Sequence, residues 1–174
     1  PIPVQYLIWL GKVLTGDLGN EPSALLPSPE EILGLDWLVI ESAYGNRAHK
    51  EADERGLQLE RAIEDVAARR GTLMIPAFAT ERTQDILYYL NTMLQFRRIP
   101  VMPVFVDAPL AIRVTQVFER YREHYKSDIQ ELFSEHPHLF QFKNLTFTPS
   151  VEGSKSINEV PAPKVIIAGS GMMN

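Results

Sequence analysis

Polar residues directly follow apolar stretches at five places in this chain, and this feature constrains the fold more than any other. The residues concerned are Asp17, Glu41, Thr80 with Arg82, Asp107 and Ser170. In a parallel α/β sheet the carboxyl ends of the strands share one edge, and ligands bind in the crevice beyond that edge. The sequence therefore predicts a single functional edge that gathers these side chains.

Apolar strands alternate with amphipathic helices along most of the chain. We expect strands over 37–40, 72–78, 101–106 and 164–168, and helices over 51–70, 81–97, from Asp107 onward and over 127–135. Near-continuous apolar strands in such an alternation are typical of a mainly parallel sheet with helices on both faces. The predicted fold class is α/β. Residues 4–15 additionally predict a β-hairpin around Leu10-Gly11.

The helix ends carry recognisable capping signals. Gly71 is expected to end the helix over 51–70, and Thr80 and Asp107 are expected to cap the amino ends of the next two helices. The helix after Asp107 is expected to bury one apolar stripe, formed by Leu110, Val114, Val117, Phe118 and Tyr121.

Composition excludes several classes of function. The chain has 174 residues, which is enough for one domain with its own core. It has no cysteine, so disulfides, thiol nucleophiles and thiolate metal sites are excluded, and a cytoplasmic location is the expectation. No apolar run approaches the roughly 20 residues that span a bilayer, and no signal peptide is expected. A net charge of −5 means that a nucleic-acid substrate would need a local basic cleft.

The polar residues before position 50 each allow two interpretations. Asp17, beside glycines, could reach a metal ion or serve only as a turn aspartate. Glu41 ends a buried strand, so it needs a partner: an acid/base role, the orientation of a histidine, or the capping of a loop would each supply one. Arg47 and His49 could bind a phosphate or lie in a solvated loop.

Two later segments also allow a phosphate-binding interpretation. Arg82 stands in the first turn of a helix, where the helix dipole disfavours a cation unless an anion is near. That anion could be a substrate phosphate, or Glu81 or Asp85 of the protein. The glycines of Gly169-Ser170-Gly171 would let a ligand approach the backbone, although a turn after a strand needs the same residues. The two histidines of His136-Pro137-His138 are too few for a metal site and indicate a loop.

The order of the motifs points to a known family. GDLGN, ESAYGNRAH, IPAFATERTQDILYYL, PVFVDAPLA and VIIAGSGMMN follow one another along residues 12–174. Their sequence resembles the β-CASP branch of the metallo-β-lactamase-fold nucleases, which includes ribonuclease J-like enzymes and the endonuclease of pre-mRNA 3′ ends. The resemblance implies a Rossmann-like β-CASP domain over residues 35–174. It also implies that residues 1–34 are a hairpin and linker at the edge of the metallo-β-lactamase domain.

The resemblance also implies roles for single residues. Asp17 matches the aspartate that bridges two zinc ions, and Glu41 matches the acidic motif that supports a catalytic histidine. Ser170, with Gly169 and Gly171, matches the segment that lines the path of the RNA phosphates. Three residues in shared blocks are assigned only loosely to structure or substrate contact: Arg47, His49 and Arg82.

Some family features are absent from these 174 residues. The His-x-His-x-Asp-His zinc motif would lie upstream, and two later histidine motifs would lie downstream. The expectation is therefore a segment of a two-zinc ribonuclease that acts on single-stranded RNA, and the segment alone is expected to bind no zinc stoichiometrically and to be inactive as a nuclease. A non-catalytic nucleotide-binding or interaction module and a DNA-acting nuclease of the same family are the alternatives. Nothing in the sequence gives the oligomeric state.

Overall fold

The computed structural model describes residues 12–15, 23–28, 33–34, 36–40 and 53–169. Strand β1 (Lys12–Thr15) pairs in parallel with β2 (Trp37–Ile40), in the register Lys12 with Trp37. The turn of the predicted hairpin, at Leu10-Gly11, lies outside the described residues. The pairing joins strands from both sides of the expected domain boundary at residues 34 and 35, and that boundary stays a prediction.

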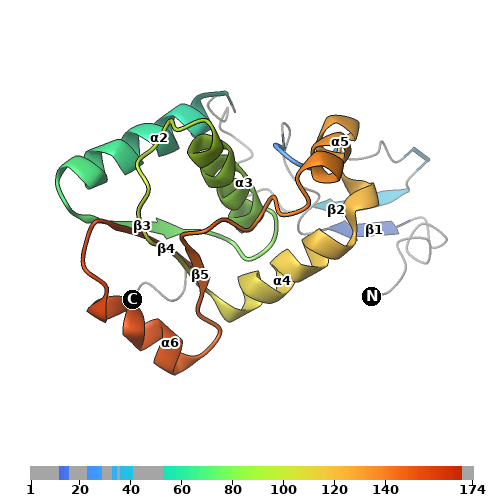
Figure 1. The fold of residues 1–174 in the computed structure, drawn as a ribbon. Helices are drawn as coiled ribbons and strands as arrows, with labels where there is room; N and C mark the ends of the chain where they lie inside the picture. The colour runs from blue at the N-terminus through green and yellow to red at the C-terminus, as the bar shows by residue number, and fades with distance from the viewer. Residues whose placement is uncertain (1–11, 16–22, 29–32, 35, 41–52, 170–174) are drawn as a thin grey trace.

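The main sheet has four strands, all parallel. They are β3 (Thr72–Pro76), β4 (Val104–Asp107), β5 (Leu145–Phe147) and β6 (Lys164–Ala168), and their spatial order is β3-β6-β4-β5. The parallel α/β fold expected from the sequence is therefore confirmed. Strand β6, last in the chain, lies between β3 and β4, so its carboxyl end is flanked on both sides (Figure 1).

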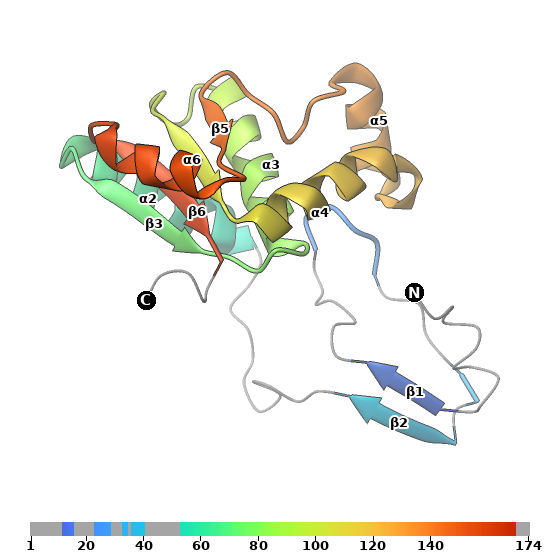
Figure 2. The ribbon, with the colours of Figure 1, turned by 90° about the horizontal axis from the view of Figure 1, so that it is seen from below.

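Helices cover both faces of this sheet. Helices α2 and α3 lie on one face and α6 lies on the other, as Figures 1 and 2 show from two directions. The helices are α2 (Asp53–Ala68), α3 (Arg82–Gln95), α4 (Pro109–Arg120), α5 (Ser127–Glu135) and α6 (Val151–Ser156), with 3-10 turns η1 (Arg122–His124) and η2 (Ile157–Glu159). Among the described helices, none is long and apolar enough to cross a membrane.

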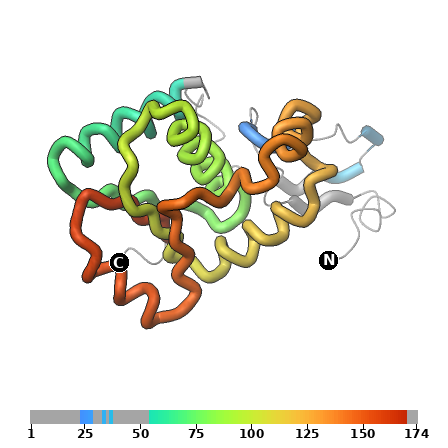
Figure 3. The backbone as a smooth tube through the Cα atoms, in the orientation of Figure 1, coloured from blue at the N-terminus to red at the C-terminus, as the bar shows by residue number. Residues whose placement is uncertain are grey.

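The core forms between the sheet and the apolar sides of these helices. On α3, Leu87, Leu90 and Met93 are buried in this core, and Ile86 and Leu94 are partly buried against it. The segment over residues 23–28 also joins this core through Leu25, which is fully buried. Figure 3 shows this segment beside α5, where the Lys126 backbone N–H donates to the Leu25 carbonyl at 3.1 Å.

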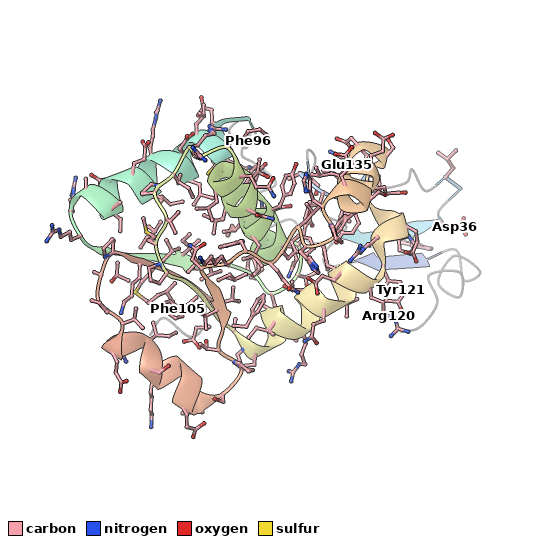
Figure 4. All side chains as sticks on the ribbon, in the orientation of Figure 1. Asp36, Phe96, Phe105, Arg120, Tyr121 and Glu135 are labelled. Carbon is pink, nitrogen blue, oxygen red and sulfur yellow. The ribbon has the colours of Figure 1, made fainter. Side chains whose placement is uncertain are left out.

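The predicted buried face of α4 is only partly right: Phe118 packs against the core, but most of the stripe does not. The side that packs inward carries Ala111, Ile112 and Thr115, and three of the residues expected inside are instead exposed: Leu110, Val117 and Tyr121. The reason is a buried polar contact, because the Thr115 hydroxyl accepts a hydrogen bond from Gln84 Nε2 at 2.8 Å and donates to the Ala111 carbonyl. A threonine with both roles satisfied can be buried, and it turns the helix away from its most apolar stripe. Tyr121 lies at the outer end of α4 in Figure 4.

Helix α2 ends at Ala68, two residues before the predicted end at residue 70. Arg70 adopts the left-handed conformation with φ of 51°, and Gly71 follows it and donates its N–H to the Val66 carbonyl at 2.9 Å. Helix α3 ends in the same way at Arg97, which has φ of 55°. Both arginines occupy a position where glycine is usual, because a side chain is disfavoured in this conformation.

Candidate functional site

The carboxyl ends of β3, β6 and β4 lie side by side at one edge of the sheet. Ala168 of β6 is in register with Pro76 on one side and with Asp107 on the other. The Ala77 N–H continues the ladder by donating to the Ala168 carbonyl at 2.9 Å. Gly169 therefore follows directly beside the start of the β3–α3 turn, which contains Phe78. The sequence expectation of a shared edge is met for these strands.

The β3–α3 turn, residues 77–81, is tightly constrained. The carbonyl of Phe78 accepts hydrogen bonds from both the N–H of Thr83, at 3.3 Å, and its hydroxyl, at 2.8 Å. Glu81 has φ of 65° and ψ of −57°, and the Arg82 N–H donates to the Thr80 carbonyl at 2.8 Å. These values describe a γ-turn centred on Glu81, a conformation that is rare and strained for a residue with a side chain.

Thr80 does not cap α3, contrary to the sequence expectation. Glu81 is the residue at the amino end of α3, and no side chain caps the helix there. In the γ-turn the carbonyl of Thr80, and not its hydroxyl, accepts the hydrogen bond, and the hydroxyl of Thr83 donates to the Phe78 carbonyl. The amino end of α3 is therefore held by hydrogen bonds to backbone carbonyls and not by a side-chain cap.

Asp107 does not cap α4 either. Its two carboxylate oxygens accept hydrogen bonds from the Thr148 hydroxyl, at 2.9 Å, and from the Ser154 hydroxyl, at 2.7 Å. Helix α4 begins instead with Pro109 at its first turn, where a residue without an N–H loses no hydrogen bond. Asp107 thus ties the end of β4 to the β5–α6 segment and to α6, which is a structural role.

Arg82 forms an ion pair with Asp85 on the same helix, with 3.7 Å between Nη1 and Oδ2. The Arg82 side chain is 43% exposed and the Asp85 side chain only 6%. The protein therefore supplies one of the anions that the sequence allowed for Arg82, while much of the guanidinium remains open to solvent. Phosphate binding by Arg82 stays a prediction.

The carboxyl of Asp85 is electrostatically unusual. Burial, and after it the charge of the nearby Glu81, raise its pKa from the ordinary 3.8 to about 6. The cations Arg82, Arg55 and Lys126 lower it, but by less. Within the described part of the chain, its Oδ1 atom is buried without a hydrogen-bond partner. A fully ionised Asp85 is therefore costly for the fold.

Gln84 lies between these residues and links α3 to α4. Its Nε2 donates to the Thr115 hydroxyl and to the Ala79 carbonyl, at 2.8 and 3.2 Å. Its Oε1 is buried and, among the described residues, accepts no hydrogen bond. Two adjacent residues in the first turn of α3, Gln84 and Asp85, thus each hold an unpaired buried acceptor.

Several site residues expected from the sequence lie outside the described residues. They are Asp17, Glu41, Arg47, His49, Ser170 and Gly171. The described members of the expected set are Arg82 and Gly169, and the structure places both at the edge that follows β3 and β6.

The described residues do not by themselves fit a metal centre. No group of three or more histidine, aspartate or glutamate side chains is close enough there to hold a metal ion. His124 lies in η1, and His136 and His138 lie near the end of α5, away from the strand ends. The two-zinc site and the bridging role of Asp17 therefore stay predictions.

Phe78 was not singled out from the sequence, and Asp85 was named only as a possible ionic partner of Arg82. The predicted strand over 72–78 included Phe78, whereas β3 ends at Pro76 and leaves Phe78 exposed in the turn that follows. The burial of Asp85 had no local signal, since it depends on packing against distant parts of the chain.

Comparisons with known proteins agree with this architecture. The sequence profile of the Beta-Casp domain matches residues 83–174, which is more than half of the chain. Ribonuclease TTHA0252 of Thermus thermophilus is 34% identical over 161 residues, covering 92% of this chain and 37% of that protein. Transcription termination factor FttA of Methanosarcina mazei is 29% identical, with 93% and 26% covered.

A third relative comes from yeast. Endoribonuclease YSH1 of Kluyveromyces lactis is 26% identical over 167 residues, with 92% of this chain and 21% of that protein covered. The chain thus spans well under half of the length of these relatives. Profile, relatives and parallel α/β fold agree, and the chain belongs to the β-CASP nuclease family.

Proposed function

We propose that this chain is part of a longer ribonuclease that hydrolyses phosphodiester bonds in RNA. In this proposal the β-CASP domain forms the lid and the substrate-binding wall of the enzyme. The observation that carries it is the position of Arg82, half exposed in the first turn of α3, at the edge that Gly169 also borders. Similarity to proteins named ribonuclease and endoribonuclease supports RNA as the substrate class.

The expected substrate is single-stranded RNA. A net charge of −5 does not favour a broad surface for duplexes, so the cationic part of the site has to be local. Arg82 at a helix amino end can supply such a local contact, because helix N–H groups and a guanidinium both attract phosphate. Ser170, Arg47 and His49 are further proposed contacts.

The metal chemistry is proposed for the longer parent protein. Two zinc ions would supply an activated water and stabilise charge at phosphorus. Asp17 is proposed as the bridging ligand and Glu41 as the residue that supports a catalytic histidine. The remaining donors and the metallo-β-lactamase half would come from outside these residues, and the expected location is the cytoplasm.

A cleavage assay of the full-length parent tests the proposal. A labelled single-stranded RNA should be cut in the presence of zinc or manganese, and a chelator should stop the reaction. The same sequence as DNA should be cut more slowly. Absence of RNA cleavage, together with tight binding of a mononucleotide by these 174 residues alone, would favour the nucleotide-binding module instead. Faster cleavage of DNA would favour the DNA-acting nuclease.

A further inference from the structure

We propose that Phe78 is a stacking platform for a base of single-stranded RNA, next to the phosphate contact at Arg82. The inference rests on the proposed function and adds a residue and a mode of recognition to it. Proteins that bind single strands without sequence preference combine cationic groups for the backbone with aromatic rings on which bases stack.

The side chain of Phe78 is exposed although its backbone is held firmly. The ring is 73% exposed. Its carbonyl accepts two hydrogen bonds from Thr83, and the preceding residue, Ala77, donates to Ala168 of β6. Because the backbone is already held, stacking of a base on the ring would cost little backbone entropy, and the side chain itself has only two torsions to restrict.

The surroundings of Phe78 distinguish it from an ordinary exposed apolar residue. Single exposed apolar side chains are common and need no explanation. Phe78, however, follows the carboxyl end of a parallel strand, which is the edge where ligands bind in such sheets. Its carbonyl accepts a hydrogen bond from Thr83, the neighbour of Arg82 in α3. A base contact at Phe78 and a phosphate contact at Arg82 would therefore come from adjacent parts of the chain.

The β3–α3 turn and the first turn of α3 keep features that a purely structural connection would not need. Glu81 adopts a strained conformation, and Gln84 and Asp85 each hold a buried acceptor without a donor among the described residues. Unsatisfied buried groups and strain persist where a function requires them. These features support a binding role for the turn, although the stacking proposal depends on Phe78 itself.

The structure offers a matched control at the other end of α3. Phe96 is 72% exposed, nearly the same as Phe78, and follows the last residue of the helix. Since α3 has 14 residues, about 21 Å of helix separates its two ends. Figure 4 labels Phe96 at the end of α3 that is remote from the β3–α3 turn.

The experiment measures the affinity of the full-length parent, with its metal removed by a chelator, for a short labelled oligouridylate. Phe78→Ala should weaken binding about 5- to 150-fold, the range that stacking of one base supplies. Phe78→Tyr and Phe78→Trp should bind like the wild type, whereas Phe78→Leu should bind like Phe78→Ala. Phe96→Ala should leave affinity unchanged, and melting temperatures should stay similar throughout.

An oligonucleotide with abasic sites isolates the stacking contribution. It keeps the phosphates, so the wild type and Phe78→Ala should bind it equally well if the ring contacts a base. Restoration of affinity by Phe78→Leu, or an equal loss on the abasic strand, would overturn the proposal. If the wild type cuts RNA but Phe78→Ala binds normally, only this inference fails. If the wild type neither binds nor cuts RNA, the proposed function fails.

Discussion

Arg82 and Asp85 form an ion pair across the first turn of α3, and the two side chains differ sharply in exposure. The guanidinium is 43% exposed, whereas the carboxylate is 6% exposed. The buried Asp85 carboxylate therefore affects the stability of the fold, whereas the accessible Arg82 guanidinium can still bind an anion. Substitution of Asp85 tests the first effect and substitution of Arg82 tests the second.

Asp85→Asn should stabilise the protein near neutral pH. The pKa of Asp85 is raised from 3.8 to about 6 in the folded state, so the folded protein binds this proton more tightly than the unfolded chain. Protonation of Asp85 therefore stabilises the folded state. This stabilisation is complete below pH 3.8 and is lost as the pH rises through 6. The wild type should lose on the order of 3 kcal/mol between these limits from this group. Chemical denaturation of both proteins at several pH values measures it. An equal decline in Asp85→Asn would disprove the assignment.

Arg82→Ala should weaken the binding of single-stranded RNA to the full-length parent. If Arg82 neutralises one phosphate, the slope of log affinity against log salt should fall by about 1. Arg69→Ala is the matched control. Arg69 follows the last residue of α2 and pairs with Asp65 of that helix at 2.9 Å, but it lies before β3, away from the carboxyl ends of the strands. If Arg82→Ala changes neither the affinity nor the salt slope, Arg82 does not contact the RNA and its role is limited to the ion pair with Asp85. Ser170→Ala should also weaken binding.

Arg97→Gly should stabilise the domain. Arg97 ends α3 with φ of 55°, which disfavours any residue with a side chain, and glycine removes that penalty. Part of the gain is offset by the greater freedom of glycine in the unfolded chain, so about 0.5–1 kcal/mol is expected. Gln95→Gly, within the helix, should instead cost about 1 kcal/mol. Equal effects in urea denaturation would contradict the role of the left-handed residue.

Glu41→Gln in the full-length parent should slow cleavage on the order of 10²-fold or more if Glu41 supports a catalytic histidine. Single-turnover rates on labelled RNA measure this, and the melting temperature serves as the control for folding. A rate close to that of the wild type would return Glu41 to the alternative role of capping a loop.

The sequence predicts three of the four strands of the main sheet, because β3, β4 and β6 are short apolar runs, whereas the three-residue strand β5 is not among the predicted strands. The strand over Lys164–Ala168 and the helix over Ser127–Glu135 have the predicted bounds. Apolar character along such segments is a local property, and burial in a parallel sheet follows from it directly.

The sequence fails where distant residues decide. Asp107 is a good local cap, but hydroxyls of Thr148 and Ser154, more than 40 residues away, take both of its oxygens. The orientation of α4 follows from the hydrogen bond between Thr115 and Gln84, which are 31 residues apart. The spacing of apolar residues along α4 carries no information about this bond. Arg82 and Gly169 could be assigned to one edge because strand ends are readable, whereas the burial of Asp85 could not.

Photo-crosslinking tests the central claim most directly, namely that RNA lies along the carboxyl edge of the four-stranded sheet. The full-length parent, freed of metal, would be irradiated with a single-stranded RNA that contains 4-thiouridine, and the crosslinked peptides would be identified by mass spectrometry. The account predicts crosslinks between Phe78 and Arg82, that is, in the β3–α3 turn and at the start of α3, and around Gly169. Crosslinks confined to α6 or to the opposite edge, near Arg69 and Phe96, would contradict it.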